Sequence, residues 1–194
     1  MPALFSFARS RALSASLFLL LFSLPALSAS DLGGPFELID QDGINVTQEN
    51  YIGAPALLYF GFASCANICP TDLARMASLT RTLAEENGIE ITPIFVTIDP
   101  ERDTPEKLAS YVKQFHPRFV GLSGSDQAIA DIADKYAVYY SPVPMGESYM
   151  MDHSTFTFLV GADGHYLAHF PRDMPLNQMS LKIADLLSQP LPRN

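Results

Sequence analysis

The stretch that decides the fold is Phe60-Gly61-Phe62-Ala63-Ser64-Cys65-Ala66-Asn67-Ile68-Cys69-Pro70-Thr71-Asp72. It holds the only two cysteines of the protein, Cys65 and Cys69, four positions apart. An apolar run precedes it, and apolar residues at helical spacing follow it. Two thiols at such a strand-to-helix junction can exchange a disulfide, bind a metal ion or cross-link a helix end. The remaining sequence has to separate these alternatives.

The flanking segments predict a central strand and its helix. The nearly continuous apolar run from Pro55 to Phe62 is typical of a strand buried on both faces of a sheet. Pro70 suits the first turn of a helix, where its missing N–H costs nothing, and Asn87-Gly88 favours a helix end. This is the thioredoxin arrangement of a cysteine pair, in which the helix dipole favours the thiolate.

The rest of the chain alternates predicted strands and helices, and the segment Ser141–Asp152, rich in Pro, Gly and Met, is predicted to be a loop. The expected elements are a β-hairpin over 36–47, a strand over 91–98, a helix from Thr104 to before Pro117, a strand over 119–122, a helix capped by Ser125, a strand-turn-strand unit over 155–170 and a helix over 176–187. This order predicts an α/β fold of the thioredoxin-like type, with an N-terminal β-hairpin and a central mixed sheet flanked by helices on both sides.

Composition and the N-terminus restrict the functional classes. The chain has 194 residues, 48% hydrophobic and 17% charged, which fits a single domain over 31–194. A net charge of −9 without any Lys/Arg run argues against a nucleic-acid partner. Residues 1–30 have the layout of a secretory signal peptide: Arg9 and Arg11, an apolar run, then Pro25 and small residues.

The alternative for residues 1–30 is an uncleaved membrane anchor, through which the protein would associate with the membrane. A span needs about 20 apolar residues, and this run reaches that length only by including Pro25 and several serines. We therefore expect export to the periplasm or to the outer face of the inner membrane. Outside the cytoplasm two neighbouring thiols oxidise unless they are used or protected.

Helical geometry puts the two Cα atoms about 6 Å apart, a separation that allows a disulfide and equally allows two sulfurs to bind one ion. A third ligand would favour the metal. His116 lies at a helix end, and His165 and His169 share a strand but lie too far apart to bind one ion. His153, in Asp152-His153-Ser154, precedes a predicted buried strand whose start faces the cysteine segment in a thioredoxin-like sheet. A structural role for His153 remains the alternative at this point.

Two thiolates and one imidazole form a soft, mixed ligand set that suits copper, as Cu(I) or Cu(II). Structural zinc usually takes four protein ligands. Thioethers also bind copper, and Met145, Met150 and Met151 lie near His153 in the sequence. The commoner role of such methionines is to fill gaps or to line an adaptable partner surface.

Three separated motifs resemble the Sco/SenC family: Tyr59–Pro70 with both cysteines, Thr97–Pro105, and Tyr149–Ser154. The resemblance implies an exported, thioredoxin-like copper-binding domain that delivers copper to, or reduces the thiols of, the CuA site of cytochrome c oxidase subunit II. Carried onto this chain, it implies one copper ion per chain, bound by Cys65, Cys69 and His153. It also implies a Cys65–Cys69 disulfide as the oxidised, metal-free form. The partners would be subunit II or another cuproprotein, and a copper donor protein.

The chain departs from the family pattern at two places. Ala66-Asn67-Ile68 stands where the family often has Pro-Asp-Val, which removes an acid beside the thiols, and Met150-Met151 before Asp152 is unusual. The charged segment Asp99–Asp103 we interpret as the approach to the next helix, whose dipole its acids favour, with a partner surface as the alternative and no catalytic role.

The second functional hypothesis is a thiol-disulfide oxidoreductase. Cys65 would attack a partner disulfide and Cys69 would resolve the mixed disulfide. Three residues instead of two separate these cysteines, and His153 stands where a thioredoxin carries a proline. A peroxide-reducing enzyme is disfavoured, because Thr71 and Arg75 follow Cys69 but no such activating pair precedes Cys65.

Overall fold

The apolar run after Pro55 forms the central strand β3, Ala56–Gly61, in a computed structural model that describes residues 32–189. All six residues of β3 are buried. It pairs in parallel with β4, Thr92–Thr97, and antiparallel with β8, Phe156–Val160. Neighbours on both edges and helices on both faces explain why this strand is apolar without alternation. The predicted signal peptide lies outside the described residues.

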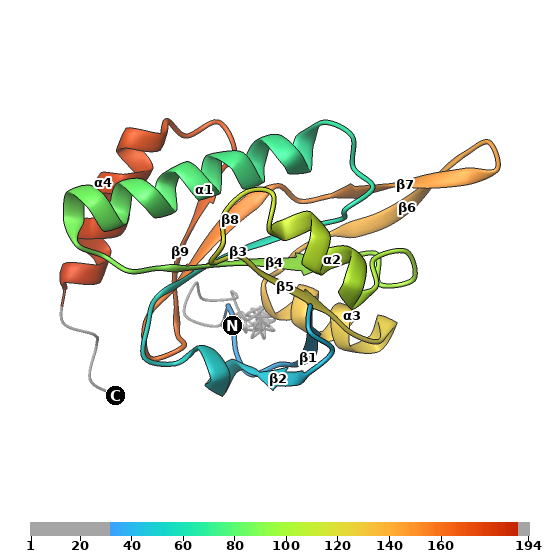
Figure 1. Cartoon of the computed structure of the whole chain (residues 1–194), viewed down its shortest axis with the longest axis horizontal. Coiled ribbons are helices and arrows are strands. Elements are labelled where there is room, and N and C mark those ends of the chain that lie inside the picture. Colours follow the sequence, from blue (N-terminus) through green and yellow to red (C-terminus); the bar gives the residue numbers. More distant parts are fainter. Residues whose placement is uncertain (1–31, 190–194) are drawn as a thin grey trace, which may run out of the picture.

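The sheet has seven strands in the order β2-β1-β5-β4-β3-β8-β9 (Figure 1). Strands β3, β4 and β5 are parallel, and the outer strands pair antiparallel. The remaining bounds are Glu37–Asp40 for β1, Asn45–Thr47 for β2, Val120–Ser123 for β5 and Tyr166–Pro171 for β9, and a 3-10 helix, η2, follows β2 over Gln48–Tyr51. The predicted mixed sheet and N-terminal β-hairpin are both confirmed.

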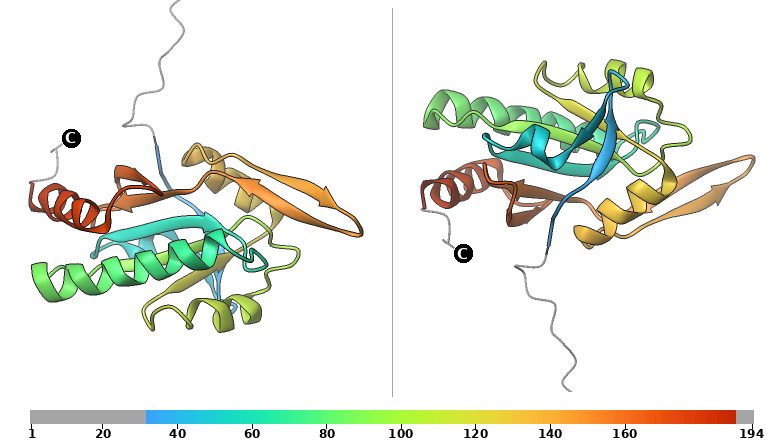
Figure 2. Two further views of the ribbon diagram at one scale, coloured as in Figure 1. Left: turned by 90° about the horizontal axis from the view of Figure 1, so that it is seen from above. Right: turned by 90° about the horizontal axis from the view of Figure 1, so that it is seen from below.

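Three helices cover one face of the sheet and one covers the other (Figures 1 and 2). They are α1, Ile68–Asn87, α2, Pro105–Val112, and α4, Leu176–Ser188, against α3, Asp126–Lys135, on the opposite face. Adjacent residues of β3 show the division. Tyr59 donates a hydrogen bond to Asp72 of α1, whereas Phe60 packs on Tyr136 at the end of α3, with ring centroids 5.6 Å apart. The prediction of helices on both sides is confirmed.

Most predicted helix ends are confirmed. Gly88 ends α1 in the left-handed conformation, with φ of 66°, and Thr104 and Ser125 cap α2 and α3 with their side chains. The predicted extension of α2 as far as Pro117 is wrong. The helix ends at Val112, and the next residues form tight turns with i→i−3 hydrogen bonds such as Phe115 N to Val112 O, 3.1 Å.

The prediction of a loop over Ser141–Asp152 is also wrong. Strands β6, Tyr140–Met145, and β7, Ser148–His153, form a separate two-stranded antiparallel sheet that projects from the body (Figures 1 and 2). Pro142 and Pro144 are two residues apart, so both fit the positions whose N–H groups point away from the partner strand, and no ladder hydrogen bond is lost. Gly146 has φ of 62° in the two-residue connection, as a type II′ turn requires.

No helix within residues 32–189 combines the length and the apolar character needed to cross a membrane.

Candidate metal centre

The cysteine arm of the site is the segment that links β3 to α1, and it is firmly packed. Cys65 precedes α1 and is 8% exposed, while Cys69 lies in the first turn and is completely buried. Both are free thiols. The backbone N–H of Cys69 donates to Cys65 Sγ over 3.4 Å. The start of the helix therefore holds the two residues side by side, as the sequence predicted.

The two thiols differ in acidity. Burial opposes ionisation of Cys65, but hydrogen bonds from the backbone N–H groups of Cys69, Asn67 and Ile68 outweigh it and lower the pKa of Cys65. Burial, with a contribution from the nearby Cys65 sulfur, raises the pKa of Cys69. Cys65 is therefore the thiol that ionises first.

The histidine arm is the hairpin of β6 and β7, and His153 is the last residue of β7. Its Nε2 lies 3.7 Å from Cys69 Sγ, and its Nδ1 lies 2.8 Å from the Ser154 carbonyl oxygen. Because a carbonyl oxygen only accepts, Nδ1 carries the proton and the Nε2 lone pair faces the sulfur. Burial lowers the pKa of His153, which keeps the ring neutral at pH 7. Cys69 and His153, which are 84 positions apart in the sequence, are therefore in contact in the fold.

Aromatic side chains and one glycine enclose this contact. Tyr59 and Phe62 pack edge-on against the His153 ring, with centroids 6.3 and 6.0 Å away. A Cβ atom at Gly61 would lie 3.0 Å from Cys69 Sγ, so the glycine lets the sulfur lie against β3 without displacing its neighbours. The rings bury the imidazole, which favours its neutral form.

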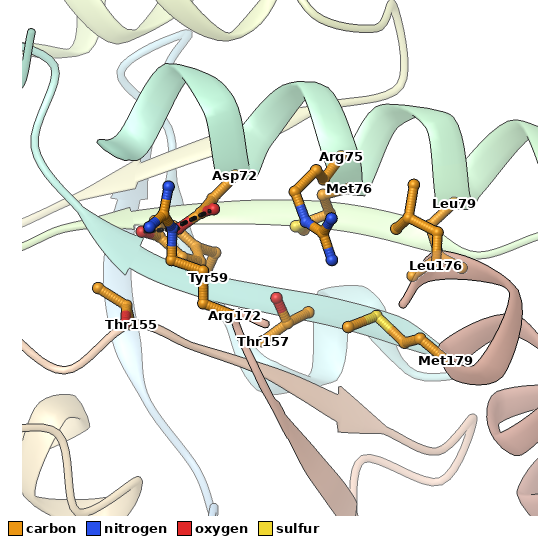
Figure 3. Close-up of a pocket in the computed structure, with 10 residues that line it drawn as sticks. All are labelled: Tyr59, Asp72, Arg75, Met76, Leu79, Thr155, Thr157, Arg172, Leu176 and Met179. Carbon is orange, nitrogen blue, oxygen red and sulfur yellow. Dashed lines mark hydrogen bonds and ion pairs between the residues drawn. The ribbon is translucent and has the colours of Figure 1, made fainter. Parts of the chain in front are cut away.

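Behind Tyr59 lies a polar cluster that sequence reasoning missed. The Tyr59 hydroxyl donates to Asp72 Oδ2 over 2.9 Å, and Arg172 Nε donates to Asp72 Oδ1 over 2.9 Å. Figure 3 shows these side chains meeting beside a small pocket between α1, β3 and α4. Burial, followed by the nearby sulfurs and Asp72, raises the pKa of Tyr59. The cluster holds the Tyr59 ring against His153. Its only signal in the sequence was a tyrosine in a buried strand, which needs a partner for its hydroxyl.

The other histidines do not join the site. His165 is 70% exposed and lies 3.2 Å from Asp163, and His169 is exposed and packs on Phe156. His116 Nδ1 accepts a hydrogen bond from the Arg118 backbone N–H. None of the three lies at the cysteine pair, as expected, but two of their predicted places are wrong: α2 ends four residues before His116, and His165 lies just before β9.

The three methionines lie on the hairpin. Met145 is 61% exposed near its tip, while Met150 and Met151 pack partly against the core. Side chains alternate along a strand, so Met151 shares the His153 face of β7 and Met150 lies on the other face. Ligation of copper by any of them stays a prediction.

Within residues 32–189 no three His, Cys, Asp or Glu side chains are gathered closely enough to hold a metal ion as they stand. Cys69 nevertheless touches both His153 and Cys65. The donor set of two thiols and a neutral imidazole fits a soft ion, provided that Cys65 and His153 approach each other further. The site is therefore two rigidly joined thiols with a third donor poised beside one of them.

The fold and the site together define a thioredoxin-like protein in which a histidine joins the cysteine pair. The family profile of SCO1/SenC matches residues 25–188, and the chain belongs to this family. It is 44% identical to an SCO2-like protein of Rickettsia prowazekii over 151 aligned residues, which are 76% of this chain and 73% of that protein. The resemblance seen in the sequence is confirmed.

Solved structures give the same assignment. The structure of Arabidopsis thaliana ScoI with copper bound matches with a TM-score of 0.78 and 35% identity, over 80% of this chain and 97% of that one. BsSco is described as a member of the Sco family of cytochrome c oxidase assembly proteins with a disulfide switch. Its structure matches with a TM-score of 0.66 and 28% identity, over 82% of this chain and 95% of that one.

Proposed function

We propose that this protein is an exported copper chaperone that carries one copper ion and delivers it to a cuproprotein, with the CuA site of cytochrome c oxidase subunit II as the recipient. The observation that carries the proposal is the 3.7 Å contact between Cys69 Sγ and His153 Nε2. Copper in the related ScoI of Arabidopsis thaliana and the assembly role given for BsSco support it.

The copper ion is the cargo, and three side chains would bind it. Cys65, whose pKa is lowered, supplies the first thiolate. Cys69 has a raised pKa and releases its proton as the ion binds, so that copper uptake releases protons. His153 offers the lone pair of Nε2, because Ser154 fixes the proton on Nδ1. This set suits Cu(I) and Cu(II).

Titration of the reduced protein with Cu(I) against a chromophoric chelator tests the proposal. We expect close to one copper ion per chain. Residues that only orient a metal ligand typically change affinity about 10–100-fold when removed, so loss of the ligand in His153→Ala should reach at least the upper end of that range. His169→Ala, an exposed histidine on β9, is the control. Absence of near-stoichiometric binding, or equal affinity of wild type and His153→Ala, would refute the assignment.

A second function, thiol-disulfide exchange, is favoured by the unequal acidity of the two thiols. The Cys65 thiolate would attack a partner disulfide and form a mixed disulfide, while one partner thiolate leaves. Cys69, on losing its proton, would then attack Cys65 Sγ, which leaves the Cys65–Cys69 disulfide and a fully reduced partner. A disulfide switch in the related BsSco supports this alternative.

Reduction of insulin by catalytic amounts of the protein, with a reductant in excess, separates the two functions. Turnover that is lost in Cys65→Ser but retained in His153→Ala would assign the exchange function. Turnover no faster than in Cys65→Ser would leave the cysteines as copper ligands only. The two functions are compatible in one protein, because reduction of a disulfide between CuA cysteines yields the thiols that copper then binds.

Export rests on the sequence of residues 1–30, and we propose the periplasm or the outer face of the inner membrane as the location. Expression of the full chain in a Gram-negative host, followed by fractionation and mass measurement, tests it. A soluble periplasmic chain shortened by about 30 residues indicates cleavage, and a full-length chain in the membrane fraction indicates a retained anchor. A full-length chain in the cytoplasm would contradict export.

A further inference from the structure

The hairpin that carries His153 forms its own two-stranded sheet, and only its base is joined to the main sheet, through Ser154 and Thr155, which lead into β8. Further along the hairpin, Tyr149 is held by the segment after β4. The Tyr149 hydroxyl donates to Asp99 Oδ1 over 2.8 Å, and Arg102 Nη1 donates to the Tyr149 carbonyl oxygen over 2.8 Å. The Arg102 guanidinium also lies 3.7 Å from the centroid of the Tyr149 ring. We call Asp99, Arg102 and Tyr149 the Arg102 cluster.

The anchoring side of the Arg102 cluster is rigid. The Asp99 side chain is only 2% exposed, and its second oxygen accepts from Arg102 Nε over 2.6 Å. The backbone N–H groups of Arg102 and Asp103 both donate to the Asp99 carbonyl oxygen. This turn of backbone therefore fixes the Asp99 carboxylate and the Arg102 guanidinium relative to each other, without any contribution from the hairpin.

The same segment also holds the cysteine arm. Asp103 is completely buried, and its Oδ2 accepts from the Ala63 backbone N–H over 2.7 Å. Lys107 Nζ joins Asp103 Oδ1 to the Ser64 hydroxyl, at 2.8 and 2.9 Å. Ala63 and Ser64 directly precede Cys65. Residues 99–107 thus contact both arms of the candidate metal centre.

Strand geometry connects the Arg102 cluster to the imidazole. Tyr149 and His153 are four residues apart on β7, and alternation puts them on the same face. Because an extended strand transmits its orientation over such a length, fixing Tyr149 fixes the direction in which His153 points. The sequence interpretation of Asp99–Asp103 as a helix approach was therefore incomplete, since these side chains are used within the protein.

We propose that Asp99 and Arg102 are positioning residues that hold the β6–β7 hairpin over the cysteine pair and so set the separation of His153 from Cys69. Release of Tyr149 from the Arg102 cluster moves the imidazole away from the sulfur and weakens copper binding. The copper consequence rests on the proposed function, whereas the positioning itself does not. A network that only stabilised the fold would leave the hairpin in place when altered mildly.

Two measurements on Arg102→Gln test the proposal. We expect the Cu(I) affinity to fall about tenfold or more, as for other residues that orient a metal ligand. In the metal-free protein, hydrogen exchange of the β7 backbone amides should become at least several-fold faster, with that of β3 unchanged. Arg102→Lys should give a smaller effect, because lysine keeps the charge but not the planar guanidinium. Arg118→Gln, which breaks an ion pair with Glu90 far from the hairpin, is the matched control.

Tyr149→Phe gives an independent variant, because it removes only the hydroxyl that donates to Asp99. It should change β7 exchange and copper affinity in the same direction as Arg102→Gln, and it covers the case in which the latter fails to fold. If both variants lower the melting temperature but leave β7 exchange unchanged, the positioning role is overturned and the copper function stands. If the wild-type protein binds no copper while β7 exchange responds, the proposed function fails and the positioning role stands.

Discussion

The two arms of the candidate metal centre differ in how they are built. The cysteine arm continues a central strand that is buried along its whole length and paired on both edges. The histidine arm is a separate two-stranded sheet whose outer part is exposed, with Val143 at 45% and Met145 at 61%. Segments with few buried contacts open at low free-energy cost. A fixed pair of thiols beside a more adjustable imidazole would suit the proposed copper chaperone, which has to bind its ion and release it.

The largest effect should follow from breaking the cysteine arm at its buried support. Asp103 is completely buried and accepts hydrogen bonds from Ala63, Thr97 and Lys107. Asp103→Ala leaves these donors without an acceptor and should reduce the free energy of unfolding by about 3 kcal/mol. Urea denaturation measures it. Asp131→Ala, on the exposed side of α3, should stay within about 0.5 kcal/mol. A loss under about 1 kcal/mol for Asp103→Ala would mean that this arm is not rigidly supported.

A single methyl group should disturb the cysteine arm nearly as much. The Cβ of Gly61→Ala would lie 3.0 Å from Cys69 Sγ and equally close to the rings of Phe95 and Tyr59. Overpacking of this kind costs about 1–3 kcal/mol. Thermal unfolding and Cu(I) titration of the same variant should both show a decrease. Unchanged stability and affinity would contradict the close packing of the sulfur on β3.

The two thiols within the cysteine arm should react at different rates. The thiolate is the reactive form, so the lowered pKa of Cys65 gives it more thiolate at pH 7 than Cys69, whose pKa burial raises. Cys65 should be alkylated by iodoacetamide at least about tenfold faster, with mass spectrometry of the reduced, metal-free protein as the measurement. Unfolding in guanidinium should equalise the rates. Faster labelling of Cys69 in the folded protein would reverse the assignment of the attacking thiol.

The smallest effect should come from the outer part of the histidine arm. Val143 is exposed on β6 and pairs with Met150. Val143→Thr keeps a β-branched residue in the strand and should change the free energy of unfolding by less than about 0.5 kcal/mol. Copper affinity should stay within about twofold. A larger change would mean that the hairpin is supported along its whole length, and that the two arms do not differ in how firmly they are packed.

The local elements followed from the sequence because each depends on residues near one another. The apolar run of β3, the proline in the first turn of α1 and the glycine that ends that helix were all sufficient signals. The hairpin was mistaken for a loop because Pro142, Pro144 and Gly146 are common in loops, and only their positions relative to a partner strand make them compatible with pairing. Composition contains no information on that register.

The sequence by itself determined the cysteine pair and its strand-to-helix junction, whereas His153 was singled out among four histidines only through the resemblance to the family. The tertiary structure alone decided that His153 Nε2 faces Cys69, that Asp72 and Arg172 hold Tyr59 against the imidazole, and that the Arg102 cluster holds the hairpin. The reason is physical. Helix, strand and turn preferences act over a few residues. Apart from the Tyr59–Asp72 hydrogen bond, 13 positions apart, these contacts join residues that are 47 to 100 positions apart, and only the packed sheet brings such residues together.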